Sequence, residues 1–133
     1  MVILIDTNIF LDVYLNRNFP ESLFAIKKAI HRQDRIYFSA SSYTDFYYIA
    51  CNQLHNKWLA REYACNLAKQ VFFAAVNDEC ICSALNSEID DLEDALVDSV
   101  AISINADYIL TRDKKDFEHS IVKAITPTEF LSL

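Results

Sequence analysis

Four aspartates stand where elements of regular structure are expected to begin or end. Asp6 directly follows an apolar run near the start of the chain, and Asp113 follows a second apolar run near its end. Asp45 and Asp94 fall in or near the first turns of two expected helices. Carboxylates are the ligands that Mg²⁺ and Mn²⁺ favour, and cations held in this way can activate water and stabilise a displacement at phosphorus. The four positions therefore indicate phosphoryl-transfer chemistry, provided that the fold brings them together.

Each aspartate taken alone also has an ordinary structural explanation. Asp45 and Asp91 could simply favour helix N-termini, where the helix dipole stabilises negative charge. Asp113 and Asp116 are residue types that form turns. Asp6 is the hardest to explain in this way, because a charge directly at the end of an apolar strand has no packing role.

Other ligand types are expected to play no part. Three histidines form no ligand spacing and are interpreted as surface residues: His31, His55 and His119. Four cysteines match neither a zinc framework nor a redox Cys-x-x-Cys motif and are expected to be buried apolar residues: Cys51, Cys65, Cys80 and Cys82.

Composition excludes several classes of function. The chain contains no glycine, so dinucleotide-binding Gly-x-Gly-x-x-Gly turns and Walker-type loops are ruled out in their usual forms. The net charge of −7 argues against a broad basic surface that binds nucleic acid by neutralising phosphates. Carboxylates that hold divalent cations against a phosphate remain compatible with an acidic protein, although the charge could also serve only solubility.

Hydrophobic patterning predicts an α/β fold in which a parallel sheet is covered on both faces by helices. Expected strands are Val2–Ile5, Arg35–Ser39, Tyr108–Thr111 and Ile121–Ile125, while Val71–Val76 is either a strand or the end of a helix. Expected helices follow Asp6, span Pro20–Arg32 and Asn56–Gln70, and start after Ser41 or Ser42, after Asn77 and after Asp90 or Asp91. Thr126 and Pro127 open a terminal helical turn. Ligand sites in such folds form beyond the carboxyl ends of the strands, which is where Asp6 and Asp113 are expected.

Several apolar side chains are expected to face the core from these helices: Leu23, Ile26, Ala29, Ile30, Trp58, Leu59, Tyr63 and Leu92. The length of 133 residues and the lack of linkers predict a single domain, 1–133. The first apolar run is too short for a signal peptide or a membrane span, so a cytoplasmic protein without a membrane partner is expected.

The order and spacing of these motifs resemble the PIN domain family, in particular its VapC-type toxin ribonucleases. Val2–Ile9 is similar to the family's opening strand and Asp-Thr-Asn turn, and Asp91–Leu96 to its third acidic motif. Ala106–Phe117 resembles the final strand with its acidic turn, and Ile125–Leu131 a common family ending. The resemblance covers nearly the whole chain.

The resemblance implies a Rossmann-like parallel sheet and a ribonuclease that depends on Mg²⁺ or Mn²⁺. It assigns catalytic roles to Asp6, Asp45, Asp94 and Asp113, and metal binding to Asp6, Asp94, Asp113 and Asp116, with Asp113 and Asp116 as alternatives for the last acidic position. Asp45 stands where the family usually has Glu, so it could act through water. Asn8 and Thr111 match polar positions that orient the carboxylates. RNA as substrate, a homodimer and an antitoxin whose Arg or Lys enters the acidic site are also implied.

Two other functions are compatible with part of this pattern. A haloacid-dehalogenase-like phosphatase also places an Asp after its first strand, but it needs a second Asp two residues later, where this chain has Asn8. The second alternative is a PIN-like module that binds without catalysis. Asp45 in place of Glu is the one feature in its favour, and the presence of acidic residues at all four positions argues against it.

Overall fold

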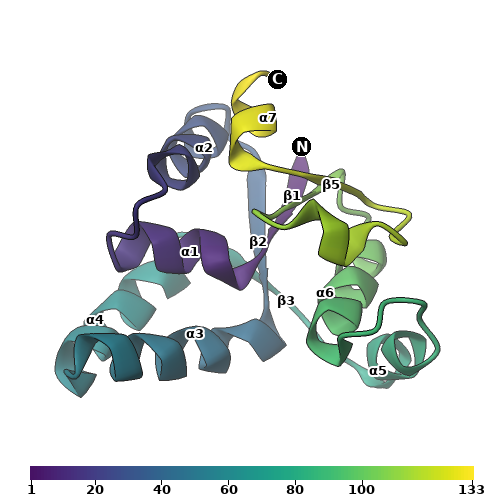
Figure 1. The fold of residues 1–133 in the computed structure, drawn as a ribbon, viewed down its shortest axis with the longest axis horizontal. Helices are drawn as coiled ribbons and strands as arrows, with labels where there is room; N and C mark the ends of the chain where they lie inside the picture. Colours follow the sequence, from purple (N-terminus) through teal and green to yellow (C-terminus); the bar gives the residue numbers. More distant parts are fainter.

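The computed structural model describes residues 1–133 and shows one parallel sheet between two layers of helices (Figure 1). Its five strands are β1 (Val2–Ile5), β2 (Arg35–Ser39), β3 (Phe72–Ala74), β4 (Tyr108–Leu110) and β5 (Lys123–Ile125). The helices are α1 (Thr7–Tyr14), α2 (Pro20–His31), α3 (Ala40–Leu54), α4 (Lys57–Ala68), α5 (Asp78–Leu85), α6 (Leu92–Ser103) and α7 (Pro127–Leu131), with a 3₁₀ helix, η1 (Lys114–Phe117). The predicted fold class is confirmed, and the undecided run Val71–Val76 contains strand β3.

Strand β1 is buried on both faces and separates two hydrophobic cores. Ile3 and Ile5 face a core built with α1, α2, α3, α4 and α7. Leu4 points to the opposite face, into a core built with α5, α6 and the segment around η1. This alternation follows from the two-residue period of a strand, and burial on both sides explains why the strand is a continuous apolar run.

The strand order is β3-β2-β1-β4-β5, with all neighbours parallel. The chain moves outward from β1 through β2 to β3, and then returns to the other side of β1 with β4. The carboxyl ends of β1 and β4 therefore flank the point where the direction of winding reverses. Such a switch point leaves a crevice between helices that run to opposite faces of the sheet.

Side-chain caps fix the starts of several helices. Asn56, Asn77 and Asp91 each accept a hydrogen bond from a backbone N–H in the first turn of α4, α5 and α6. Thr126 forms a capping box with Glu129 at α7. The prediction that Ser41 or Ser42 caps α3 is wrong: the helix begins at Ala40, directly after β2, and leaves no loop in which either serine could cap it.

Small residues, not the largest apolar ones, face the core from two helices. Helix α2 buries Ser22, Ala25 and Ala29, whereas Leu23 and Ile30 are exposed. In α4, too, alanines are buried, and Trp58 is 72% exposed. The predicted inward positions of Leu23, Ile30, Trp58 and Leu92 are therefore wrong. Alanine lets helices approach closely in a chain that has no glycine.

The lack of glycine also shows at helix ends, where the left-handed conformation is taken by Asn16, Gln33, His55 and Asn105. The three histidines are exposed as expected. All four cysteines are free, but only Cys80 is buried, and Cys65 and Cys82 are exposed, contrary to the prediction. No helix has both the length and the apolar character needed to cross a bilayer.

Candidate functional site

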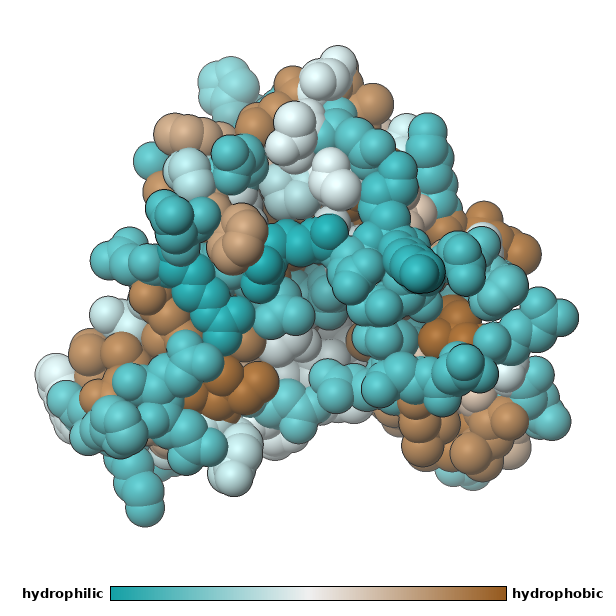
Figure 2. Space-filling model, viewed as in Figure 1, coloured by the Kyte–Doolittle hydropathy of each residue, from teal (hydrophilic) through white to brown (hydrophobic).

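A polar cleft of about 720 Å³ opens at the switch point between β1 and β4. Ile49 is the only hydrophobic residue that lines it. The other lining residues are Asp6, Thr7, Asn8, Asp91, Glu93, Asp94, Arg112, Asp113 and Asp116. Hydrophilic side chains cover the corresponding centre of the face in Figure 2, between α1 and α6. The cleft thus gathers carboxylates from three separate stretches of the chain.

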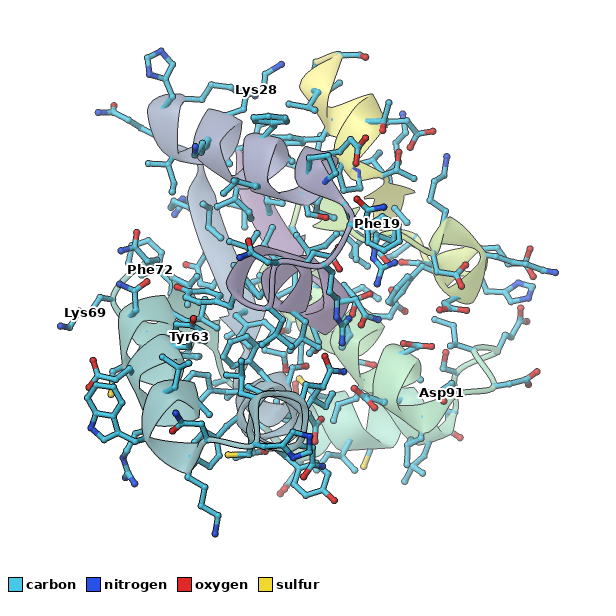
Figure 3. The ribbon with its side chains drawn as sticks, turned by 60° about the vertical axis from the view of Figure 1, so that its left-hand side comes forward. Phe19, Lys28, Tyr63, Lys69, Phe72 and Asp91 are labelled. Atoms are coloured by element: carbon cyan, nitrogen blue, oxygen red, sulfur yellow. The ribbon has the colours of Figure 1, made fainter.

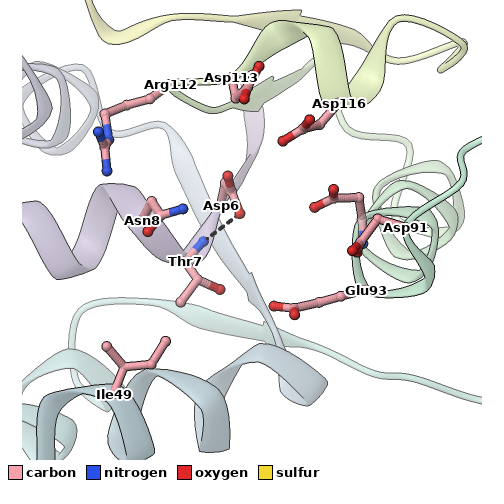
Figure 4. A pocket seen from close by; sticks show the side chains of 10 residues that line it. Asp6, Thr7, Asn8, Ile49, Asp91, Glu93, Arg112, Asp113 and Asp116 are labelled. Atoms are coloured by element: carbon pink, nitrogen blue, oxygen red, sulfur yellow. Dashed lines mark hydrogen bonds between the residues drawn. The ribbon is translucent and has the colours of Figure 1, made fainter. Parts of the chain in front are cut away.

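Asp6 lies at the centre of this cleft because it links the end of β1 to the start of α1 (Figure 4). Its Oδ1 accepts the N–H of Thr7 at 2.8 Å, and its Oδ2 accepts the hydroxyl of Thr111 at 2.9 Å. The same hydroxyl accepts the N–H of Asp113 at 3.1 Å. Burial raises the pKa of Asp6, and the bonds from Thr111 and Thr7 oppose that rise.

Asp94 projects from the first turn of α6, which Asp91 caps by accepting the N–H of Asp94 at 3.0 Å. Burial raises the pKa of Asp94 to about 7, with further contributions from the charges of Asp91, Asp116 and Asp6. A carboxyl group half-protonated near neutral pH marks a place where negative charge is concentrated. Opposing cations are therefore too few or too distant to balance that charge.

The turn after β4 brings two further carboxylates to the opposite wall. Asp113 precedes η1 and Asp116 lies within it, and both line the cleft. Burial raises the pKa of Asp116, and the charges of Asp113 and Asp91 raise it further. Because both side chains are present, the structure keeps both as candidates for the last acidic position.

Asp45 differs from the other predicted acidic residues, because it does not line the cleft. It lies on α3 five residues after the helix starts, and its charge contributes to the raised pKa of Glu93, after burial. Glu93 does line the cleft. Glu93 is therefore the carboxylate of the cleft wall that lies near Asp45. It was given no role on the basis of the sequence.

Asn8 and Thr111 occupy different positions at the site. Thr111 is buried beneath Asp6 and fixes its carboxylate. Asn8 is exposed at the cleft and accepts a hydrogen bond from Arg17 at 3.2 Å. Arg112, which was not predicted from the sequence, lines the cleft together with Asn8. Its position directly after Thr111 was the available signal.

Comparison with protein families identifies a PIN domain over residues 2–115, and the chain therefore belongs to this family. Comparison with the curated proteins gives no match.

Several solved structures have the same fold. One is a chain of VapBC2 from Rickettsia felis, in a structure bound to a DNA fragment from the promoter. It matches at 15% identity and a TM-score of 0.78, and the match covers 95% of this chain and 98% of that chain. A chain of VapBC-1 from nontypeable Haemophilus influenzae matches at 20% identity and a TM-score of 0.73, with 96% and 99% covered. A chain of a toxin–antitoxin complex from Klebsiella pneumoniae matches at 22% identity and a TM-score of 0.65, with 93% and 96% covered.

Proposed function

We propose that this protein is a divalent-metal-dependent ribonuclease that cleaves RNA at the acidic cleft, and that it is the toxin of a toxin–antitoxin pair. The observation that carries the proposal is the convergence of Asp6, Asp94, Asp113 and Asp116 on one cleft, although up to 110 positions separate them in the sequence. Membership of the PIN domain family and the polar character of the cleft support the same function.

The chemistry of these side chains fits Mg²⁺ or Mn²⁺. Every titratable group that lines the cleft, apart from Arg112, is a carboxyl group, which suits hard cations and not zinc or copper. No three carboxylates or imidazoles lie close enough to enclose an ion completely. Mg²⁺ commonly binds one or two carboxylates and keeps waters and substrate phosphates as its other ligands, so an open cleft is suitable.

Asp6 and Asp94 are the residues proposed to hold the metal, with Asp113 or Asp116 as the third. When bound, the ion would supply activation of water and stabilisation of charge at the phosphate. The chain's own contribution is to hold the carboxylates in place. Thr111 and the N–H of Thr7 fix both oxygens of Asp6, and the cap from Asp91 fixes the turn that carries Asp94.

The partner is proposed from the comparisons. Chains with this fold occur in the VapBC structures and in the toxin–antitoxin complex from Klebsiella pneumoniae. An antitoxin that inserts Arg or Lys into the cleft would neutralise the carboxylates and block access to metal and RNA. A homodimer is proposed on the same resemblance.

The direct experiment is cleavage of a mixed RNA pool by the purified protein with Mn²⁺, with Mg²⁺ and with EDTA. Cleavage that requires either ion and stops in EDTA would support the proposal. A folded protein that leaves RNA intact with both ions would contradict it, and hydrolysis of a phosphomonoester instead would favour phosphatase chemistry.

A further inference from the structure

Arg112 is the only cationic side chain that lines the cleft, where six of the other residues are acidic. In Figure 4 it lies across the cleft from Asp91 and Glu93, beside Asn8. A long, flexible cation here would be expected to fold onto the nearby carboxylates. Arg112 instead makes no ion pair with any carboxylate of the cleft, since the ion pair that it forms is with Asp12.

A clamp of two side chains holds Arg112 in this position. The side chain of Asp12 is completely buried, and its Oδ2 lies 3.0 Å from Nε of Arg112 and accepts the hydroxyl of Ser22 at 2.7 Å. The guanidinium lies over the ring of Phe19, with Cζ 3.9 Å from the ring centre. Asp12 therefore holds the guanidinium by an ion pair, although the Nε N–H forms no hydrogen bond, and Phe19 covers one face of the group.

The clamp leaves the two terminal nitrogens of Arg112 without a protein acceptor. None of the hydrogen bonds in the chain uses them, and neither nitrogen is a buried polar atom lacking a partner. The side chain remains 29% exposed. A planar pair of free N–H groups held in a fixed orientation is suited to the oxygens of a phosphate, and fixing it beforehand reduces the entropy lost on binding.

Arg112 also lines a second, smaller groove of about 260 Å³. Phe19, Ser22, Thr126 and Thr128 are among the residues that line this groove. Phe19 is 42% exposed, so part of its ring is open to solvent. The groove therefore offers an aromatic surface and the hydroxyl groups of Thr126 and Thr128, with Glu21 as its one acidic residue.

We propose that Arg112, clamped by Asp12 and Phe19, binds a phosphate of single-stranded RNA adjacent to the phosphate that is cleaved, so that the strand continues from the cleft into the groove lined by Phe19. This inference rests on the proposed ribonuclease function and adds the path of the substrate. It also explains why the cation is held by a buried carboxylate: the clamp keeps Arg112 from neutralising the carboxylates that are to hold the metal. Aromatic rings commonly stack with bases of single strands, which gives Phe19 its role.

The test measures binding of a short single-stranded RNA, in Ca²⁺ and at several salt concentrations, by fluorescence anisotropy with a gel to check that the RNA stays intact. Arg112→Gln should weaken binding about tenfold, as expected for loss of a charge-assisted hydrogen bond. It should also reduce the slope of log Kd against log salt by about 0.7, the contribution of one phosphate contact on a single strand. Lys69→Gln, an exposed cation on the far side of the molecule from Phe19 (Figure 3), is the matched control and should change neither quantity.

A folded Arg112→Gln protein with the wild-type salt slope would overturn the inference and leave Arg112 as a structural ion pair. Should that variant fail to fold, Arg112→Lys retains the charge beside Asp12 but loses the planar fork. It should then keep the slope and bind more weakly, and binding equal to wild type would overturn the inference.

Cleavage in Mn²⁺ is measured separately. RNA binding that depends on Arg112 without any cleavage would reject the proposed function alone, whereas cleavage with an unchanged slope would reject this inference alone.

Discussion

Two aspartates at opposite ends of α1 show how differently the same side chain is used. Asp12 is buried, bonded to Ser22, and lies 3.0 Å from Arg112 and 4.0 Å from Arg17. Asp6 is partly buried and bonded to neutral donors, and no cation lies within ion-pair distance. The chain thus neutralises the carboxylate that supports its structure and leaves the carboxylate at the cleft without a counter-ion.

This difference separates structural from functional charge in an acidic protein. A buried charge is costly unless it is paired and hydrogen-bonded, as Asp12 is. Burial raises the pKa of Asp94 and Asp116, and the neighbouring carboxylates, which have no cationic partner, raise it further. Such a cluster is stabilised when a cation from outside enters, which is the expected property of a metal site.

The largest expected effect is on catalysis at the unpaired cluster. Asp94→Asn removes a proposed metal ligand while keeping nearly the same shape, so cleavage of RNA in Mn²⁺ should fall about a hundredfold or more. The free energy of unfolding should stay the same or rise, because repulsion with Asp91 and Asp116 is relieved. Single-turnover kinetics and urea denaturation measure the two quantities. A loss of stability in Asp94→Asn would contradict this expectation, because it would show that Asp94, like Asp12, supports the structure.

The opposite result is expected at Asp12. Asp12→Ala should lower the free energy of unfolding by roughly 2 to 3 kcal/mol, somewhat below the usual loss for a broken buried pair, because Arg112 can turn toward solvent. Urea denaturation gives this value. Ser22→Ala, which removes one hydrogen bond to the same carboxylate, serves as the matched variant and should cost about 1 kcal/mol. An unchanged stability for Asp12→Ala would show that its pairing is incidental.

A smaller effect distinguishes Glu93 from Asp45. Glu93 lines the cleft and Asp45 does not, so Glu93→Gln should reduce the cleavage rate more, by about tenfold, which corresponds to one weakened charge interaction. Asp45→Asn should change the rate by less than that. Parallel rate measurements in Mn²⁺ decide the order. The reverse order would restore Asp45 to the role that the family resemblance gives it.

The smallest effect is the pH dependence of stability without metal. The pKa of Asp94 in the folded protein is about 7, against an ordinary value of 3.8, so the folded state binds more protons than the unfolded state between these values. Stability in EDTA should therefore fall as pH rises through this window, by on the order of 1 kcal/mol, since the carboxyl is partly exposed and solvent screens it. Mn²⁺ should reverse the fall at the upper end. Melting temperatures in EDTA that rise across the window would contradict this.

The sequence predicted the strands that carry the site better than the helix faces. The run Val2–Ile5 was predicted as a strand because it is short, mostly β-branched and followed directly by Asp6, and burial on both faces accounts for its four successive apolar residues. Helix faces were misjudged at Ile30 and Trp58, since large apolar side chains were expected inside and alanines occupy those places. Local pattern does not reveal how closely two helices approach.

The acidic site was predictable where a residue follows a strand or starts a helix, as for Asp6 and Asp113. Glu93 and Arg112 were not predicted, because their positions depend on tertiary packing. Whether they face the cleft depends on the packing of α6 and on the buried carboxylate of Asp12, which lies a hundred positions before Arg112 in the chain. Contacts between residues so far apart in the sequence are fixed by tertiary packing, so no local sequence pattern predicts them.

Asp6→Asn, assayed for cleavage of a mixed RNA pool in Mn²⁺ with circular dichroism as the control for folding, tests whether the acidic cleft is the site of cleavage. Asp78→Asn, at an exposed aspartate on α5 outside the cleft, is the matched variant and should cleave like wild type. Asparagine preserves the shape: its carbonyl oxygen can still accept the N–H of Thr7, and its NH₂ group can donate to the hydroxyl of Thr111 in place of the bond that the carboxylate accepts. It lacks the charge that attracts a cation. We expect a folded Asp6→Asn protein whose cleavage rate is lower by about a hundredfold or more. A folded Asp6→Asn protein that cuts RNA at the wild-type rate would contradict this expectation.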